Sequence, residues 1–317
     1  MQRCLRFDNR DDRPSERGHA LPADGRARYD GRMSLPSSPA PPAVSRGYVT
    51  RRIERWRGDV ATPHDDCVAE EMPIAMVYNG NPFAVMMASP HDLEDFALGF
   101  SLSEGLIDDA AQLQAVSAQP RLEGIELAMT VAAHAHGAHL DHQSERLLPG
   151  RSGCGLCGTR QLENAVRQPP AVHGDRGFGH QALERALADL PPQQPMNLAT
   201  GAVHAAAWAD ADGRIVLVRE DVGRHNALDK LIGALHHAGI GPASGFVLIT
   251  SRASYEMVTK AASAGITLLA AISAPTALAI ELARSAGMTL VGFARPGSHN
   301  VYTHPARLLA GNAGDEA

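Results

Sequence analysis

Short apolar runs alternate with longer amphipathic segments over the C-terminal part of the chain, and this alternation constrains the fold most. The runs 245–250, 267–272 and 288–293 predict strands, and the segments 253–264 and 275–285 between them predict helices. Strands that alternate with helices of about 10–15 residues indicate βαβ units with parallel strands. We therefore expect an α/β fold in which a mixed, largely parallel sheet is covered by helices.

The region just before this alternation predicts a strand pair that leads into a helix. Residues 200–208 and 215–219 are apolar runs separated by the turn-forming residues 210–213, which favours a hairpin. The second strand continues into the polar segment 220–226, and a helix with one apolar side follows. In the last predicted helix, we place Pro275 in the first turn, where proline is favoured.

The N-terminal half predicts an additional, smaller β/α region. Asn79-Gly80 separates the apolar runs 74–78 and 83–87, and this dipeptide between such runs is a strong hairpin signal. The other elements expected from periodicity are a helix at 92–104, a strand at 124–133 and a helix at 181–190.

Composition divides the chain into four parts. Residues 1–47 are rich in Arg, Asp, Gly and Pro and have little apolar periodicity, so we expect a disordered Arg/Pro-rich arm. Met33 is an alternative start of the protein. We assign 48–150 to an N-terminal α+β portion, 151–305 to an α/β portion that carries a Cys-x-x-Cys sequence, and 306–317 to a tail.

Charge and cysteine content disfavour several classes of protein. A net charge of −6 argues against a general nucleic-acid binder, which is usually basic. The chain has no run of about 18 apolar residues that could span a membrane. Four cysteines in 317 residues are too few for a disulfide framework and are typical of a protein with reduced thiols. We therefore expect a soluble cytoplasmic protein without a nucleic-acid or membrane partner.

Two of the cysteines, Cys154 and Cys157, form a Cys-x-x-Cys sequence among several glycines. Glycine leaves the sulfurs open to a partner, and this spacing can lower the pKa of one thiol. If Cys157 lies near the start of a short helix at 159–166, the helix dipole favours its thiolate. Cys-x-x-Cys serves zinc binding, redox chemistry and sulfur transfer, so the spacing alone leaves a reactive sulfur site, half a zinc site and a structural turn open.

Polar residues collect where the predicted strands end, which is where ligands of open parallel sheets bind. Arg224 and His225 follow one strand, Ser251 and Arg252 follow the next, and Arg295 follows the last. Helix N-termini bind anions and guanidinium groups suit phosphate, so these residues predict a site for a large ligand with several phosphates. The chain has no Walker sequence and no G-x-G-x-x-G, which disfavours an ordinary P-loop or Rossmann enzyme.

Structural roles stay open for the same residues. Arg224 or His225 could bridge to the acidic residues that precede them, and Ser251 and Ser254 could cap the following helix. We interpret the pair Asp229–Lys230 as a pair on the surface of a helix, not as catalytic groups.

Histidines are concentrated upstream of the two cysteines, at His134, His136, His139 and His142. Histidine and cysteine together suggest a metal site, but the spacing does not match a module of two cysteines and two histidines. We therefore expect no metal site here.

Five segments of the chain together resemble the FdhD/NarQ family, the sulfurtransferases that serve formate dehydrogenase. The most specific is the twelve-residue run 219–230, Arg-Glu-Asp-Val-Gly-Arg-His-Asn-Ala-Leu-Asp-Lys. The others are Cys154-Gly-Leu-Cys157-Gly, Ser251-Arg252 with Glu256-Met257-Val258, Ser273-Ala-Pro-Thr276 and Phe293-Ala-Arg295. The resemblance covers about residues 55–303.

This resemblance implies a function in which sulfur arrives as a persulfide from a cysteine desulfurase. It is then passed to the molybdenum cofactor with two pterin guanine dinucleotides, before that cofactor enters formate dehydrogenase. Cys154 matches the persulfide-bearing cysteine and Cys157 its motif partner. The cofactor-binding segment of the family matches Phe293, Ala294, Arg295, Pro296, Gly297 and Ser298.

The resemblance also implies a cytidine deaminase-like fold for residues 151–305 and a homodimer. The molybdenum cofactor is cargo, GDP is its expected mimic, and we expect no permanent cofactor.

Three other functions are weighed against sulfur transfer. Zinc-dependent deamination is disfavoured, because a glycine precedes Cys154 where that chemistry needs proline, and no upstream H-x-E is present. A chaperone that binds and delivers the cofactor would need the arginine loops but not Cys154. A thiol-disulfide oxidoreductase would need Cys154 and Cys157 but would have no use for the arginine loops.

Overall fold

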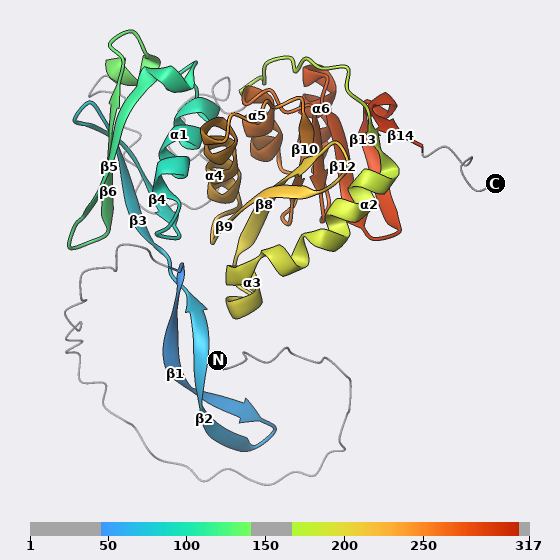
Figure 1. The fold of residues 1–317 in the computed structure, drawn as a ribbon. Helices are drawn as coiled ribbons and strands as arrows, with labels where there is room; N and C mark the ends of the chain where they lie inside the picture. The colour runs from blue at the N-terminus through green and yellow to red at the C-terminus, as the bar shows by residue number, and fades with distance from the viewer. Residues whose placement is uncertain (1–45, 141–166, 311–317) are drawn as a thin grey trace.

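The computed structural model describes residues 46–140 and 167–310. A four-stranded sheet and a six-stranded sheet lie on either side of two helices, α1 (Leu93–Ser103) and α4 (Arg224–His237), which pack against each other (Figure 1). The N-terminal and C-terminal portions are therefore joined through a layer of helices that both contribute.

The four-stranded sheet has the strand order β4-β3-β6-β5. Its strands are β3 (Met72–Tyr78), β4 (Asn81–Ala88), β5 (Leu113–Pro120) and β6 (Ile125–Val131). β3 and β4 form the predicted hairpin, and Asn79 and Gly80 both have positive φ angles, 47° and 82°, as this type of two-residue turn requires. The helix predicted at 92–104 is α1, which buries its apolar side on this sheet.

A long hairpin that the sequence pattern did not predict precedes this sheet. β1 (Tyr48–Arg57) and β2 (Val60–Ala69) pair in antiparallel fashion and reach away from the rest of the chain (Figure 1). Adjacent Arg51 and Arg52 place charge on both faces of this ribbon. The alternation of apolar and polar residues that marks a half-buried strand is therefore missing.

The six-stranded sheet has the order β13-β12-β11-β10-β8-β9. Its strands are β8 (His204–Asp210), β9 (Ile215–Asp221), β10 (Gly245–Ile249), β11 (Leu268–Ala271), β12 (Thr289–Arg295) and β13 (Ser298–Thr303). The pairs β10–β11 and β11–β12 are parallel, and the other three neighbouring pairs are antiparallel. The sheet is mixed as expected, but the expectation that it is largely parallel is wrong, because hairpins supply both of its edges. The likeness to cytidine deaminases stays a prediction.

Helices cover both faces of the six-stranded sheet. α4, α5 (Tyr255–Ser263) and α6 (Ala277–Ala286) lie on one face, and α2 (His180–Asp189) lies on the other (Figure 1). Phe246 and Leu248 of β10 pack toward α2, whereas Val247 between them packs toward the other three helices. Burial on both faces explains why this strand is a continuous apolar run.

Short elements complete the described ranges. They are β7 (Phe178–Gly179), α3 (Pro195–Thr200), β14 (Leu308–Leu309) and the 3-10 helices Ala110–Gln112, His136–His139, Pro191–Gln193 and Pro305–Arg307. The strand expected from residue 200 begins instead at His204, because Thr200 ends α3 and Gly201 closes that helix with a φ of 65°. β14 pairs with β7, so the fold extends into the segment assigned to the tail. Within the described ranges, no helix is both long and apolar enough to cross a membrane.

Helices α1 and α4 touch through their backbones. A β-carbon on Gly99 of α1 would overlap the backbone oxygen of Asp229, and a β-carbon on Gly233 of α4 would overlap the backbone oxygen of Asp95. Each helix therefore places a glycine where the other helix comes closest. This reciprocal contact sets the separation between the two portions of the fold.

We expect Gly99→Ala to lower the free energy of unfolding by about 3 kcal/mol, because the helices must separate to admit the methyl group. Urea denaturation measures the change. Gly241→Ala is the matched control, since a β-carbon there meets no atom within 4 Å. Its effect should stay within about 0.5 kcal/mol. Equal stability of the two variants would contradict the close helix contact.

Candidate functional site

Four strands of the six-stranded sheet end at one edge. β10, β11 and β12 are parallel, and β9 points the same way because β8 is antiparallel to both β9 and β10. The chain leads from β9, β10 and β11 into α4, α5 and α6, and it turns back from β12 into β13. The structure thus places at one edge the segments that the sequence assigned to a common site. We call them the edge segments: 221–224, 250–254, 272–276 and 293–298.

Backbone hydrogen bonds join three edge segments into a continuous rim. The N–H of Thr276 donates to the backbone oxygen of Ala253 at 3.0 Å, and Ala253 also forms a parallel bridge with Pro275. The N–H of Phe293 donates to the backbone oxygen of Ser273 at 3.1 Å. Pro275 therefore belongs to the rim and precedes Thr276, the N-cap of α6, so its expected place in the first helical turn is wrong.

Arg224 and His225 open α4, as predicted. The Nε atom of Arg224 is buried and has no hydrogen-bond partner in the described part of the chain. Nε2 of His225 lies 3.7 Å from a carboxylate oxygen of Glu256 on α5. Glu220 instead accepts hydrogen bonds from the first N–H groups of α3, and Asp221 is bound by other groups described below. The alternative in which Arg224 or His225 bridges to these two acids is therefore wrong for the described residues.

The second edge segment exposes Arg252 beside the buried Ser251. Ser251 Oγ donates to the backbone oxygen of Arg252 at 3.1 Å, so Ser251 does not cap α5. Ser254 occupies the N-cap position of α5 but makes no side-chain capping bond. Burial raises the pKa of Glu256, but His225 and Ser254 outweigh burial and lower that pKa below its usual value. The Glu256 carboxylate therefore stays charged and faces His225.

The last edge segment is the tip of a hairpin, not the open loop that we expected. Arg295 pairs with Ser298 across the two-residue turn Pro296-Gly297, and Gly297 has a φ of 80°. The Gly297 N–H donates to a carboxylate oxygen of Glu184 on α2 at 2.6 Å. The tip is thereby tied to the helix that covers this face of the sheet.

The side chains of this hairpin differ in whether they are exposed to a ligand. Phe293 is 44% exposed and has a φ of 51°, and Arg295 is exposed at the end of β12. Ala294 between them is 1% exposed and packs into the core beneath α2. The Ala294 side chain therefore cannot contact a ligand. Of this predicted binding residue, only the backbone is left to take part in binding.

A histidine at the start of β8 lies among these groups. Burial lowers the pKa of His204, and the positive charges of Arg224 and His225 lower it further, against an opposing contribution from Asp221. His204 is therefore neutral at pH 7. Burial is the larger cause of this shift, and the contributions of Arg224 and His225 place both cationic groups close to His204.

Asp229 and Lys230 are not on a helix surface, as we had interpreted them. Both are fully buried where α4 meets α1. Asp229 binds Lys260 of α5 at 2.9 Å and Ser103 of α1 at 2.6 Å. Burial alone would lower the pKa of Lys260, but the carboxylates of Asp229 and Glu104 outweigh it and raise that pKa above its ordinary value.

The sequence analysis did not identify Lys260 or the buried ion pairs Asp221–Lys230 and Asp229–Lys260. The apolar character of α4 was a signal that could have indicated their burial. The residues around Asp229 on α4 include Gly233 and a majority of apolar side chains, so the helix has little polar surface. A helix that is apolar on most sides is expected to be buried.

Cys154 and Cys157 lie outside the described residues. The chain on either side of them is held at the C-terminal end of α1. The N–H of Gly137 donates to the backbone oxygen of Leu106 at 2.7 Å, and a guanidinium nitrogen of Arg167 donates to that of Glu104 at 2.9 Å. Both of these hydrogen bonds lie at the C-terminal end of α1, where Glu104 also pairs with Lys260 of α5 at 2.7 Å.

The described part of the chain does not gather the upstream histidines into a cluster. His134, His136 and His139 are exposed, and His142 lies outside the described residues. Within 46–140 and 167–310, no three His, Cys, Asp or Glu side chains form a group that could hold a metal ion.

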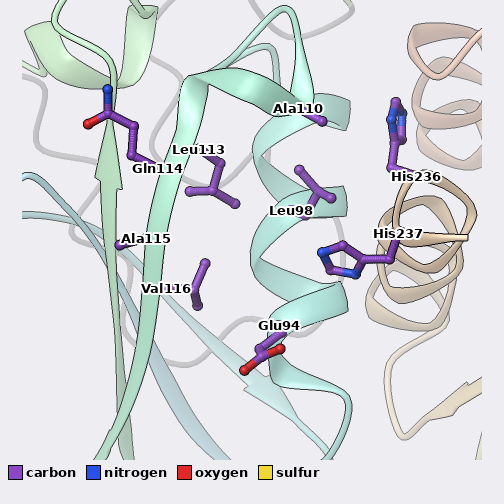
Figure 2. A pocket seen from close by; sticks show the side chains of 9 residues that line it. All are labelled: Glu94, Leu98, Ala110, Leu113, Gln114, Ala115, Val116, His236 and His237. Atoms are coloured by element: carbon purple, nitrogen blue, oxygen red, sulfur yellow. The ribbon is translucent and has the colours of Figure 1, made fainter. Parts of the chain in front are cut away.

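A cavity of about 410 Å³ lies away from the edge, between α1, β5 and the last turn of α4. Figure 2 shows Leu98 of α1, Val116 of β5 and His237 of α4 among its lining residues. α4 spans 14 residues, so this cavity is about 20 Å from Arg224 at the other end of the helix. None of the predicted site residues lines it.

Comparisons with known proteins agree with the segments quoted from the sequence. The model of the FdhD/NarQ family matches residues 69–309. A sulfur carrier protein FdhD from Xanthomonas euvesicatoria is 56% identical over 277 residues, which cover 87% of this chain and 98% of that protein. A sulfur carrier protein FdhD from Cupriavidus necator is 52% identical over 261 residues, which cover 82% of this chain and 90% of that protein.

A solved structure has the same fold. It is described as a formate dehydrogenase accessory protein from Desulfotalea psychrophila, and it superposes with a TM-score of 0.63 at 25% identity. The match covers 83% of this chain and 99% of that one. The family match and the identity to the curated relatives both span most of the chain, and the chain therefore belongs to the FdhD/NarQ family.

Proposed function

We propose that this protein is a sulfurtransferase that enables formate dehydrogenase activity. In this proposal Cys154 carries sulfur as a persulfide from a cysteine desulfurase to the molybdenum cofactor with two guanine dinucleotides. The names of the relatives support sulfur transfer and a connection to formate dehydrogenase. The protein would act in the cytoplasm as a homodimer, and the cofactor would be its cargo.

The observation that carries the cofactor-binding part of the proposal is the collection of cationic groups at one sheet edge. Arg224, Arg252 and Arg295 belong to three edge segments, and the first two stand at helix N-termini. The carboxylates nearby are already engaged: Asp221 by Lys230, and Glu256 by His225. The edge therefore offers guanidinium groups and backbone N–H groups to the pyrophosphates of a dinucleotide.

The exposed Phe293 extends this site beyond phosphate. Phe293 lies two residues before Arg295 in the chain and is 44% exposed. Exposed aromatic rings stack on planar ring systems. Phe293 would thus contact a guanine or pterin ring while Arg295 binds the phosphates, and Pro296, Gly297 and Ser298 would present backbone atoms at the tip.

Sulfur transfer takes two steps, of which the first is a thiolate exchange. The Cys154 thiolate attacks the outer sulfur of the desulfurase persulfide, a new S–S bond forms, and the desulfurase cysteine leaves as a thiolate. In the second step the outer sulfur would bind a reduced molybdenum of the cargo as sulfide, taking two electrons from the metal, and Cys154 would be released as a thiolate. Cys157 would be the motif partner of Cys154 in these steps.

A chaperone that binds and delivers the cofactor without sulfur chemistry is the second candidate. The edge segments support it, because the described site contains no cysteine and needs none to bind a dinucleotide. The two candidates differ in whether Cys154 gains sulfur.

Persulfide loading on Cys154 distinguishes the sulfurtransferase from the chaperone. After incubation with a cysteine desulfurase and cysteine, we expect the intact mass of the wild-type protein to rise by about 32 Da, one sulfur atom, and that of Cys154→Ala to stay unchanged. No adduct on the wild-type protein would favour the chaperone. An adduct that persists in Cys154→Ala would move the carrier role to another cysteine, with Cys157 the first to test.

GDP binding tests the edge. We expect Arg252→Ala and Arg295→Ala each to weaken the affinity for GDP by about tenfold or more, because each removes a charge-assisted hydrogen bond. Calorimetry measures the dissociation constant. Arg284→Ala is the matched control, since this arginine is exposed near the C-terminal end of α6 and pairs with Glu281. If all three variants bind GDP with the same affinity, Arg252 and Arg295 do not take part in GDP binding.

The titration of His204 gives an independent check. Its pKa lies below the ordinary value of 6.5, because burial and the charges of Arg224 and His225 disfavour the imidazolium. A bound pyrophosphate favours the imidazolium, so we expect saturating GDP to raise this pKa, as observed by NMR of the imidazole ring. Arg224→Ala should raise it too in the free protein. An identical titration with and without GDP would place the phosphates elsewhere.

A further inference from the structure

Asp221 is a fully buried carboxylate at the end of β9, and it is the first residue of the edge segment that carries Arg224. One of its oxygens accepts from the N–H of Gly223 at 2.7 Å and from the amide of Asn226 at 3.0 Å. The other oxygen accepts from the N–H of Ser89 at 3.0 Å and lies 2.7 Å from Nζ of Lys230. Four donors thus fix a single side chain.

These donors connect the segment 221–224 to the end of β4 in the other sheet. The Ser89 hydroxyl accepts from the N–H of Val222 at 3.2 Å, and the Asn226 amide donates to the backbone oxygen of Met87 at 2.8 Å. Val222 and Gly223, the two residues between β9 and Arg224, therefore each donate a hydrogen bond, to Ser89 and to Asp221 respectively. These bonds restrain the backbone that precedes Arg224.

Lys230 completes the arrangement from the second turn of α4. Its ammonium group is buried, donates to the backbone oxygen of Ser89 at 3.0 Å and lies 6.0 Å from the ring centre of Phe96. Burying two charges costs desolvation energy, and apolar residues of the same size often serve stability as well. What an apolar pair cannot provide is the set of hydrogen bonds that orients Gly223 and Ser89.

We propose that Asp221 and Lys230 are positioning residues, which hold Gly223 and the start of α4 so that Arg224 and the first N–H groups of that helix face the bound phosphate. This role rests on the proposed function. It acts through Arg224 and not through contact with the ligand, because both side chains are fully buried. It also makes the end of β4 part of the support of the site.

The structure supplies a matched control for the effect of a buried ion pair. Lys260 pairs with the buried Asp229 at 2.9 Å, also between α1, α4 and α5. It forms no hydrogen bond or ion pair with residues 221–224, and its other partners are Ser103, Glu104 and the ring of Phe100, at or near the C-terminal end of α1. Lys230→Met and Lys260→Met therefore remove comparable charges from the same helical layer, but only the first touches the segment before Arg224.

The experiment compares the GDP affinity of the wild-type protein, Lys230→Met and Lys260→Met by calorimetry on samples that are folded by circular dichroism. Both variants should lose thermal stability. We expect Lys230→Met to lose affinity for GDP by about tenfold, and Lys260→Met to bind GDP like the wild type. Equal losses in both variants, or no loss in Lys230→Met, would overturn the positioning role.

Ser89→Ala provides a second test that keeps the ion pair intact. It removes the hydroxyl that accepts from Val222, so we expect an affinity about threefold lower than that of the wild type. If Lys230→Met does not fold, this variant decides: a loss supports the role and wild-type affinity overturns it. Wild-type protein that binds no GDP would refute the proposed nucleotide site, and this role with it. Wild-type binding that Lys230→Met retains would refute the positioning role alone.

Discussion

The backbone contact between α1 and α4 is the constraint on which the rest of the structure depends. Gly99 and Gly233 let the two helices approach until each glycine faces a backbone oxygen of the other helix. At this distance Asp229 and Lys230 of α4 have no access to water. They are buried with their charges, and each has an opposite charge in a neighbouring element: Lys260 of α5 for Asp229, and Asp221 of β9 for Lys230. The short distance between α1 and α4 therefore accounts for both the close packing and the burial of these ion pairs.

The buried pairs relate the two portions of the chain to the candidate site. Asp221 and Lys230 join the end of β4 to the segment before Arg224, and Lys260 joins the end of α1 to α5. α4 and α5 both begin at the sheet edge where the arginines gather. The N-terminal sheet thus contributes no arginine to this edge but supports the helices that present two of them. Gly137 and Arg167 also donate to backbone oxygens at the C-terminal end of α1.

Local patterns allowed much of the fold to be predicted, and non-local pairing accounts for what they missed. The Asn79-Gly80 hairpin and the alternation after residue 245 follow from turn chemistry and periodicity. The direction of strand pairing does not. β8 joins β10 through a non-local antiparallel contact that no local period encodes, and the tight turn that returns the chain into β13 was expected to be an open loop. The arginines of the site were found because each follows a predicted strand. Asp229–Lys230 was misjudged because a charged pair on a helix is usually solvated, and the tertiary contact with α1 overrides that rule.

Sulfur transfer itself is the central claim, and the fate of a labelled sulfur atom tests it most directly. The protein would be loaded on Cys154 with radioactive sulfur, freed of desulfurase and mixed with the molybdenum cofactor and inactive formate dehydrogenase. The account predicts that the label leaves Cys154, moves with the cofactor into the dehydrogenase and appears together with formate-oxidising activity. Activity that appears while the label stays on the protein would contradict sulfur transfer and leave delivery of the cofactor as the function.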